Sequence, residues 1–160
     1  MSANFIRKLS GEKTPIWFLK FLGNIWLPFL GAGVNVDEIT EDYLYIKVSM
    51  RMRWYNKNYV GTHFGGSLYA MTDPFYMLML MNNLGRDYIV WDKAAHIEFK
   101  KPGRGKVIAE FKMSSVEIAE IKARADSAEK YIFDKPVNVI NEAGDIVASI
   151  TKTLYVKKKT

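Results

Sequence analysis

The chain has 160 residues, of which 49% are hydrophobic and 25% charged, and it contains no cysteine. A chain of this length and composition is expected to form one domain over residues 1–160 that buries roughly 70% of its unfolded surface. The absence of cysteine excludes disulfides, cysteine-based zinc sites, iron–sulfur clusters and thiol nucleophiles. It also fits a cytoplasmic protein, which is the location we expect.

The net charge is +6, but the basic residues are dispersed along the chain. They fall on a predicted strand at 51–53, in a turn at 100–106 and in the tail at 157–159. No recognition helix or aromatic RNA-binding signature accompanies them, so we do not expect a nucleic-acid partner. The tail is interpreted as a solvated terminus, and a small ligand that carries phosphate remains open.

The first predicted element is a helix over about 14–30, in the segment "PIWFLKFLGNIWLPFLGAG". Thr14-Pro15 is a helix start signal, and Pro28 and Gly31 are expected to end the helix. Lys20, Asn24 and Pro28 keep the apolar runs far below the roughly 20 residues of a membrane span, so no integral membrane segment is expected. We interpret the segment as an amphipathic helix that covers a sheet edge or groove, with docking on a membrane surface as the alternative.

Two strands are expected next, and the second is defined by its alternation from Tyr43 onward. Apolar residues occupy every second position of this half-buried strand: Leu44, Ile46, Val48, Met50, Met52 and Trp54. The segment "RWYNKNYVGTHFGG" that follows has the character of a turn and loop.

The longest apolar segment runs from about Gly66 to Leu84 and is predicted to be a helix. Apolar residues occupy nearly all of its faces, which is typical of a helix at the centre of a fold. Pro74 lies inside it and removes the hydrogen bond to the carbonyl of Ala70, so a kink is expected there.

Strands dominate the rest of the chain. A strand is predicted over 89–101, a turn at "PGRG", and a strand that alternates back from Val107 to Met113. A helix over 115–130 would be capped by Ser114 or Ser115, and a hairpin over 137–158 would turn around Gly144. Because one buried helix needs a sheet curved around it, the predicted class is α+β with a core over about 33–156.

The segment "NYVGTHFGGSLYAMTD", residues 58–73, resembles the helix-entry motif of hotdog-fold acyl-CoA thioesterases, with the phenylacetate-type group as the nearest match. Asn58, Gly61-Thr62, Gly65-Gly66 and Asp73 fall on the Asn, the Gly-Thr pair, the paired glycines and the catalytic acid of that family. "IEFKKPGRGKVIAEF", 97–111, also resembles the strand–turn–strand of these enzymes. The chain as a whole resembles an uncharacterised group of hotdog-like thioesterases.

This resemblance implies a hotdog fold and hydrolysis of acyl thioesters, on acyl-CoA or on an acyl carrier protein, without a cofactor or a metal. It also implies a homodimer or tetramer, because the acid of this family serves a site across the dimer interface. Two departures favour a rival, a non-catalytic protein that binds acyl-CoA or fatty acid. The histidine of the family falls on Phe64, with His63 one position earlier, and Pro74 directly follows the acid. A hotdog dehydratase fits less well, since its pairing of histidine and acid is not evident.

The two glycines and the acid are the main catalytic candidates. Gly65 and Gly66 let a ligand approach the backbone, where the free N–H groups of a helix start would polarise a thioester carbonyl. The alternative is a tight turn or close packing of helix and strand. Asp73 lies about two turns further on the same face, and burial would raise its pKa and suit it to act as base or nucleophile. The alternative is a carboxylate that accepts hydrogen bonds at the kink.

The remaining candidates each carry a structural alternative. Asn58 would orient water or form a turn, and His63 would act as general base or bond within the loop. Thr62 and Ser67 would bind ligand, although capping of the helix is favoured. Phe64 is also predicted to lie beside the substrate. Lys101 and Arg104 are predicted to contact the phosphates of the substrate, and the alternative for these two cations is an exposed turn surrounded by solvent. Asp92, His96 and Glu98 share one predicted strand face, but a metal site is not expected there.

Overall fold

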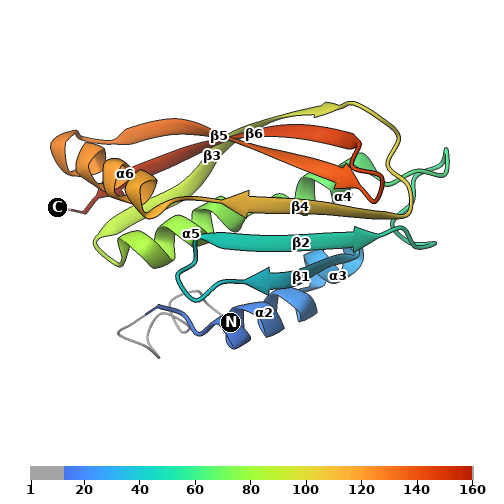
Figure 1. The fold of residues 1–160 in the computed structure, drawn as a ribbon, viewed down its shortest axis with the longest axis horizontal. Coiled ribbons are helices and arrows are strands. Elements are labelled where there is room, and N and C mark those ends of the chain that lie inside the picture. The colour runs from blue at the N-terminus through green and yellow to red at the C-terminus, as the bar shows by residue number, and fades with distance from the viewer. Residues whose placement is uncertain (1–12, 160) are drawn as a thin grey trace.

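The computed structural model describes residues 13–159, which form one six-stranded antiparallel sheet with helices against it (Figure 1). The strand order across the sheet is β1-β2-β4-β5-β6-β3. The strands are β1 (Val34–Ile39), β2 (Tyr45–Arg51), β3 (Tyr88–Phe99), β4 (Lys106–Lys112), β5 (Tyr131–Asn141) and β6 (Ile146–Lys158). The helices are α2 (Ile16–Ile25), α3 (Leu27–Ala32), α4 (Gly65–Ala70), α5 (Phe75–Leu84) and α6 (Ser115–Ser127).

The core lies between the sheet and α5, as the predicted α+β class requires. Phe75 and Met79 of α5 are buried, and the ring of Phe75 lies 5.0 Å from that of Phe111 on β4. The prediction that every second residue of β2 points into the core is confirmed for Ile46 and Val48, which are fully buried. Aliphatic and aromatic side chains from two strands thus close over a helix that is apolar around most of its circumference.

The central helix is divided into α4 and α5 at the position of Pro74. Pro74 has no N–H to offer the carbonyl of Ala70, and the N–H of Asp73 donates to that carbonyl instead, at 3.2 Å. The hydroxyl of Thr72 donates to the carbonyl of Tyr69 at 2.8 Å, and the Asp73–Pro74 bond is cis. The predicted kink is therefore a complete break, and it places Asp73 at the junction of the two helices.

The N-terminal helical segment covers the edge of the sheet, as predicted, but it consists of two helices. Pro28 lies in the first turn of α3, a position that tolerates proline, and so it does not end a helix. The side chain of Asn24 accepts from the N–H of Val36 at 2.7 Å and donates to its carbonyl at 3.3 Å. Lys20 donates to the carbonyl of Asp37. These bonds satisfy backbone groups of β1 that an edge strand leaves free.

Two further expectations differ from the structure. β3 pairs with β6, whereas β4 pairs with β2 and β5, so the segment at 100–105 crosses between strands that are not neighbours. The apolar alternation of β2 ends at Arg51, and the side chain of Trp54 is 84% exposed rather than inward. Alternation in sequence could indicate the strands but not their partners.

The helix and the hairpin that were predicted near the C-terminus are both present. Ser114 caps α6 by accepting a hydrogen bond from the N–H of Glu117 at 3.1 Å. The turn between β5 and β6 contains Gly144 with φ of 84°. Among the described residues, no helix is long and apolar enough to cross a membrane.

Candidate active site

One face of α4, continued into the helix junction, carries the acid and the first glycine toward β3 and β6. Gly65, Tyr69 and Asp73 follow one another at successive helical turns. A Cβ atom on Gly65 would lie 2.9 Å from the ring of Phe99 at the end of β3. The hydroxyl of Tyr69 and the carboxylate of Asp73 both reach Lys152 on β6.

Lys152 is the centre of a buried charged cluster. Its Nζ donates to Oδ1 of Asp73 at 2.7 Å and lies 3.2 Å from Oδ2 of Asp92. The hydroxyl oxygen of Tyr69 is 3.5 Å from the same nitrogen. The side chain of Lys152 is only 1% exposed and that of Asp92 13%, whereas that of Asp73 is 44% exposed. Asp73 is thus the member of the Asp73–Asp92–Lys152 cluster that a ligand can reach.

A β-bulge separates the face of Asp92 from that of the later residues of β3. The pairing of β3 with β6 shifts between Asp92 and Ala94, so that Asp92 is paired with the buried Leu154. An extra residue in one strand reverses the side of the sheet to which later residues point. His96 and Glu98 therefore lie on the outer face, with side chains 76% and 52% exposed. The predicted common face of Asp92, His96 and Glu98 is wrong for this reason.

The pKa values of the two carboxyl groups of the cluster are shifted in opposite directions. Burial raises the pKa of Asp92, interaction with Asp73 raises it further, and the pKa reaches about 7 in spite of Lys152. Burial alone would raise the pKa of Asp73, but interaction with Asp92, the hydrogen bond from Lys152 and its positive charge outweigh burial and lower that pKa. Within residues 13–159, neither carboxyl oxygen of Asp92 has a hydrogen-bond partner of good geometry, which agrees with a carboxyl group that readily becomes neutral.

The expectation that burial raises the pKa of Asp73 is therefore wrong, because it did not include Lys152. The raised pKa belongs to Asp92, the more deeply buried partner. Two carboxyl groups beside one ammonium group share the charge of a single carboxylate near neutral pH. Asp73 is the ionised member, so it is available at pH 7 to accept a proton from water or to hold a water molecule in place.

Aromatic rings lie close to both glycines at the start of α4. A Cβ atom on Gly66 would lie 2.4 Å from the ring of Phe64, as one on Gly65 would meet Phe99. Phe64 and Phe99 are each 57% exposed. The predicted alternative of close packing at the glycines is therefore present in the structure. The glycines also adjoin two surface hollows, of about 410 Å³ beside Gly65 and about 390 Å³ beside Gly66.

Asn58 and Thr62 form a turn with each other. The amide of Asn58 donates to Oγ1 of Thr62 at 2.8 Å, and its Oδ1 accepts from the N–H groups of Val60 and Thr62 at 3.1 and 3.0 Å. These bonds match the turn-forming alternative for Asn58. Phe64 is the N-cap of α4 and no side chain of the described residues caps the helix, so the favoured capping role of Thr62 and Ser67 is wrong. Ser67 is buried and lines the hollow beside Gly66.

His63 is buried and joins this loop to the segment before β4. Its Nε2 lies 3.0 Å from the carbonyl oxygen of Gly105, and its N–H donates to the carbonyl of Gly103 at 2.9 Å. Burial lowers the pKa of His63 although the bond to Gly105 acts in the opposite direction. The ring also lines the hollow beside Gly65. His63 is thus a neutral hydrogen-bonding group within the loop, the alternative that the sequence left open.

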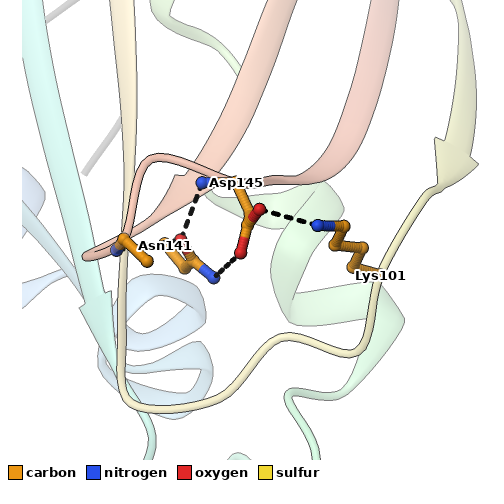
Figure 2. Close-up of polar contacts among 4 residues, drawn as sticks. Lys101, Asn141 and Asp145 are labelled. Carbon is orange, nitrogen blue, oxygen red and sulfur yellow. Dashed lines mark hydrogen bonds and ion pairs between the residues drawn. The ribbon is translucent and has the colours of Figure 1, made fainter.

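The predicted phosphate-binding cations lie in the exposed segment before β4. Figure 2 shows Lys101 reaching across to the β5–β6 turn, where its Nζ lies 2.6 Å from Oδ1 of Asp145. Asn141 holds Asp145 through two further bonds, of 3.2 and 2.9 Å. Lys101 lines the hollow beside Gly65, and Arg104 is exposed. An anion that binds Lys101 would have to compete with Asp145.

Lys152 and the inward position of Asp92 were not anticipated from the sequence, although a signal for each exists. Every second residue of β6 is apolar and buried, and Lys152 occupies one position of that series: Ala148, Ile150, Lys152, Leu154 and Val156. Asp92 likewise follows Tyr88 and Val90 in the buried phase of β3. A lone charge in the apolar phase of a strand indicates a buried partner of opposite charge.

Comparison with known proteins identifies the family. The family described as "Domain of unknown function (DUF4442)" matches residues 15–156. The chain belongs to this family. No curated protein sequence matches this DUF4442 chain.

Solved structures share the fold of this DUF4442 chain at low sequence identity. PA5026 of Pseudomonas aeruginosa, a protein of unknown function described as "Probable Thioesterase", is 16% identical over 93% of this chain and 99% of its own, with a TM-score of 0.79. The thioesterase HI1161 of Haemophilus influenzae is 16% identical over 90% and 91%, with a TM-score of 0.64. The E. coli PaaI protein from the phenylacetic acid degradation operon is 14% identical over 82% and 85%, with a TM-score of 0.56. These similarities confirm the hotdog fold.

Proposed function

We propose that this protein hydrolyses acyl thioesters, with acyl-CoA as the substrate class and Asp73 as the group that activates water. The observation that carries the proposal is the half-exposed carboxylate of Asp73, held ionised by a buried lysine beneath it. A charged cluster of this kind is costly to bury and is a marker of a functional site. The likeness in fold to the thioesterase HI1161 supports this reaction class by analogy.

In the proposed reaction the thioester carbonyl accepts hydrogen bonds from the backbone N–H groups of Gly65 and Gly66. The carboxylate of Asp73 takes a proton from water as the water oxygen bonds to the carbonyl carbon. The tetrahedral intermediate then breaks its carbon–sulfur bond, and the thiolate takes the proton from Asp73. The products are a carboxylic acid and a free thiol, and no cofactor is consumed.

A second copy of the chain completes the proposed site. Gly66 lies in the first turn of α4, whereas Asp73 lies beyond the other end of that helix, so we infer that the two do not act on the same carbonyl group within one copy. β3 lies at the end of the strand order and pairs with β6 alone, whereas the other edge strand, β1, is covered by α2. A long uncovered edge strand favours pairing with a second copy. We therefore propose a homodimer in which the glycines of one copy face Asp73 of the other.

The hollow of about 410 Å³ beside Gly65 is the proposed entry for the substrate. Phe99 and Lys101 line it, which provides an apolar wall and a cation for a phosphate-bearing thioester. Asn58 and His63 line the same hollow, and their catalytic roles remain predictions from the sequence. One observation favours the rival, a non-catalytic acyl-CoA binder: the rings of Phe64 and Phe99 cover the two glycines.

The test is a panel of acyl-CoA substrates with short, long and aromatic acyl groups, followed with a thiol-detecting reagent. We expect turnover on part of the panel and a loss of at least about 100-fold in kcat for Asp73→Asn, since general-base catalysis contributes 10²–10⁴-fold. Asp126→Asn is the matched control, because Asp126 also pairs with lysines but lies on α6. Absence of hydrolysis with acyl-CoA binding retained would establish the rival. Hydrolysis that survives both Asp73→Asn and Asp73→Ala would refute the mechanism.

Mixing two inactive variants tests whether the site is shared. Gly66→Val blocks one half of the proposed site and Asp73→Asn the other. If the two halves come from different copies, a mixed dimer contains one site with both changes and one intact site. We expect mixing and refolding of the two variants to restore part of the wild-type activity. No restoration, with mixed dimers shown by native mass spectrometry, would place both groups in one copy.

A further inference from the structure

Two segments without a single acidic residue meet at one end of the molecule. Residues 16–36 and 51–72 contain no Asp or Glu, although the chain has 17 acidic residues. The first segment forms α2 and α3, and the second runs from the end of β2 through α4. Figure 1 shows α3 and the β2–α4 connection at the right-hand end, opposite α6. The two acid-free segments therefore lie together at this end, which they share with the β5–β6 turn that carries Glu142 and Asp145.

Hydrogen bonds hold the two segments together as one surface. The side-chain amide of Asn56 donates to the carbonyl of Ala32 on α3 at 3.0 Å and to that of Arg51 at 2.9 Å. The hydroxyl of Tyr55 lies near Gly33, within 3.6 Å of where a Cβ atom would be. Asn56 is buried by these contacts, so the loop is fixed against α3.

Large apolar side chains protrude from this surface into solvent. Leu27 on α3 is 79% exposed, and Trp54 in the loop is 84% exposed. The ring of Trp54 meets that of Tyr55 edge to face at 5.6 Å. Together with three nearby cations they form what we call the basic aromatic patch: Trp26, Leu27, Leu30, Arg51, Arg53, Trp54, Tyr55 and Lys57.

The apolar surface continues along α2. Trp17, Phe21 and Ile25 recur every four residues and are exposed, while Lys20 and Asn24 on the other side of the helix bond to β1. The helix is thus attached to the sheet through Lys20 and Asn24, with Leu19 and Leu22 half-buried, and it presents a second apolar stripe to solvent. A surface helix usually exposes polar residues on its outer face, so this exposed apolar stripe is unusual.

The cations of the patch have no acidic partner among residues 13–159. Arg51, Arg53 and Lys57 are exposed, and no ion pair joins them to another residue of the part of the chain that the structure describes. On β1, Asp37 and Glu38 lie further along the strand than Val34, the residue paired with Met50, and Lys20 donates to the carbonyl of Asp37. The carboxylate of Glu142 lies near Gly105, whose carbonyl accepts from the N–H of Met52. The positive charge is therefore available to an anionic partner.

We propose that the basic aromatic patch docks this protein on an anionic lipid surface. Tryptophan and tyrosine favour the boundary between headgroups and acyl chains, and unpaired cations add attraction to anionic lipids. The most exposed apolar side chains of the patch, Leu27 and Trp54, protrude from the surface, so they can enter a fluid boundary without a matching set of pockets, which a folded acidic protein would need. This inference does not depend on the hydrolase activity.

Vesicle binding by the full chain tests the proposal. We expect co-sedimentation with vesicles of phosphatidylcholine and phosphatidylglycerol at 7:3, a blue shift of tryptophan emission, and much weaker binding to phosphatidylcholine alone. Replacing both Arg53 and Lys57 by Gln should weaken binding roughly 30-fold, from the attraction of each cation to an anionic surface. Leu27→Ser should weaken it roughly tenfold or more, through the lost burial of a leucine.

Matched changes at the opposite end of the molecule serve as controls. Lys122→Gln with Lys130→Gln removes the same charge near α6, and Val116→Ser removes an aliphatic side chain that is 66% exposed. Both should bind vesicles as the wild type does, and all variants should keep the wild-type melting temperature because every changed residue is exposed. The proposal fails if the wild type does not bind the anionic vesicles or if patch and control variants bind equally. It also fails if the patch variants change only the oligomeric state in gel filtration, since the patch would then be an interface between copies.

Discussion

The turn at 58–64 and the Asp73–Asp92–Lys152 cluster both border α4, yet they differ in how far their polar groups are satisfied. In the turn, each hydrogen-bonding atom of the Asn58 side chain has a nearby partner, and Nε2 of His63 bonds a backbone carbonyl, whereas its buried Nδ1 has no hydrogen-bond partner among the described residues. In the cluster, two carboxyl groups share one lysine, and Asp92 lacks a well-formed hydrogen bond to any described residue. Satisfied polar groups stabilise a loop, whereas under-satisfied buried charges can change their protonation in the course of a reaction. The difference favours a structural role for Asn58, and the proposed chemistry is placed at the cluster.

The largest loss of stability should come from removing the cation of the cluster, Lys152. Lys152→Met leaves Asp73 and Asp92 facing each other without a counter-charge, and breaking a buried pair costs about 3–5 kcal/mol. Urea denaturation at pH 8 measures the free energy of unfolding. The control is Lys101→Met, which breaks the exposed pair with Asp145 and should cost no more than about 1 kcal/mol. Equal losses in the two variants would contradict the distinction between a buried and a surface charge.

Asp92→Asn should have a smaller effect on the free energy of unfolding, and it should stabilise the protein as the pH rises. Because the pKa of Asp92 is about 7 in the folded protein and 3.8 is its reference value, the folded state binds the extra proton between these limits. Stability of the wild type should therefore fall as pH rises through this window, by about 1.4 kcal/mol per unit for one proton. Because the substituted amide cannot ionise, the variant should gain about 2 kcal/mol over the wild type between pH 5 and pH 7.

Comparing variant with wild type at each pH isolates Asp92 from its neighbours. Asp73 has a lowered pKa, so its contribution is complete above pH 3.8 and is lost only in stronger acid. His63 has a lowered pKa as well, and its contribution rises with pH up to about 6.5, opposite in sign to that of Asp92. Urea denaturation at pH 5, 6, 7 and 8 gives the difference directly. A constant difference across these values would show that Asp92 is ionised throughout.

Sequence periodicity predicted the fold because the side chains that a strand or helix buries must be apolar, and they recur with the period of that element. The alternation in β2 and the apolar segment around Met79 follow from which side chains leave water, so the α+β class and the central helix could be inferred. Partner strands could not, because β3 and β4 are consecutive yet separated across the sheet. Asp73 was identified through a motif, with its position at a helix break indicated by Pro74.

The chemical state of the site depends on contacts that no local pattern contains. Lys152 is 79 residues from Asp73 in the chain, and Asp92 and Lys152 together reverse the direction of the pKa shift that burial alone would give Asp73. The bulge between Asp92 and Ala94 breaks the period of two on which the prediction for β3 relied, so His96 and Glu98 point to the opposite face of the sheet from Asp92. Side chains in the turn at 58–64 were assigned to catalysis by their type, but their hydrogen bonds became known only from the structure.

The smallest effects should come from the turn, where stability and catalysis can be separated. Asn58→Ala removes the bonds to Val60 and Thr62 and should cost about 1–2 kcal/mol in urea denaturation, with little change in kcat. Asn58→Asp keeps the accepting oxygen and the turn-forming geometry, so it should recover most of that stability. If Asn58 instead positions the attacking water through its amide, both variants would lose kcat to a similar extent, whatever their stability. Measuring kcat and the unfolding free energy on the same two proteins therefore decides whether the turn belongs with the scaffold or with the cluster.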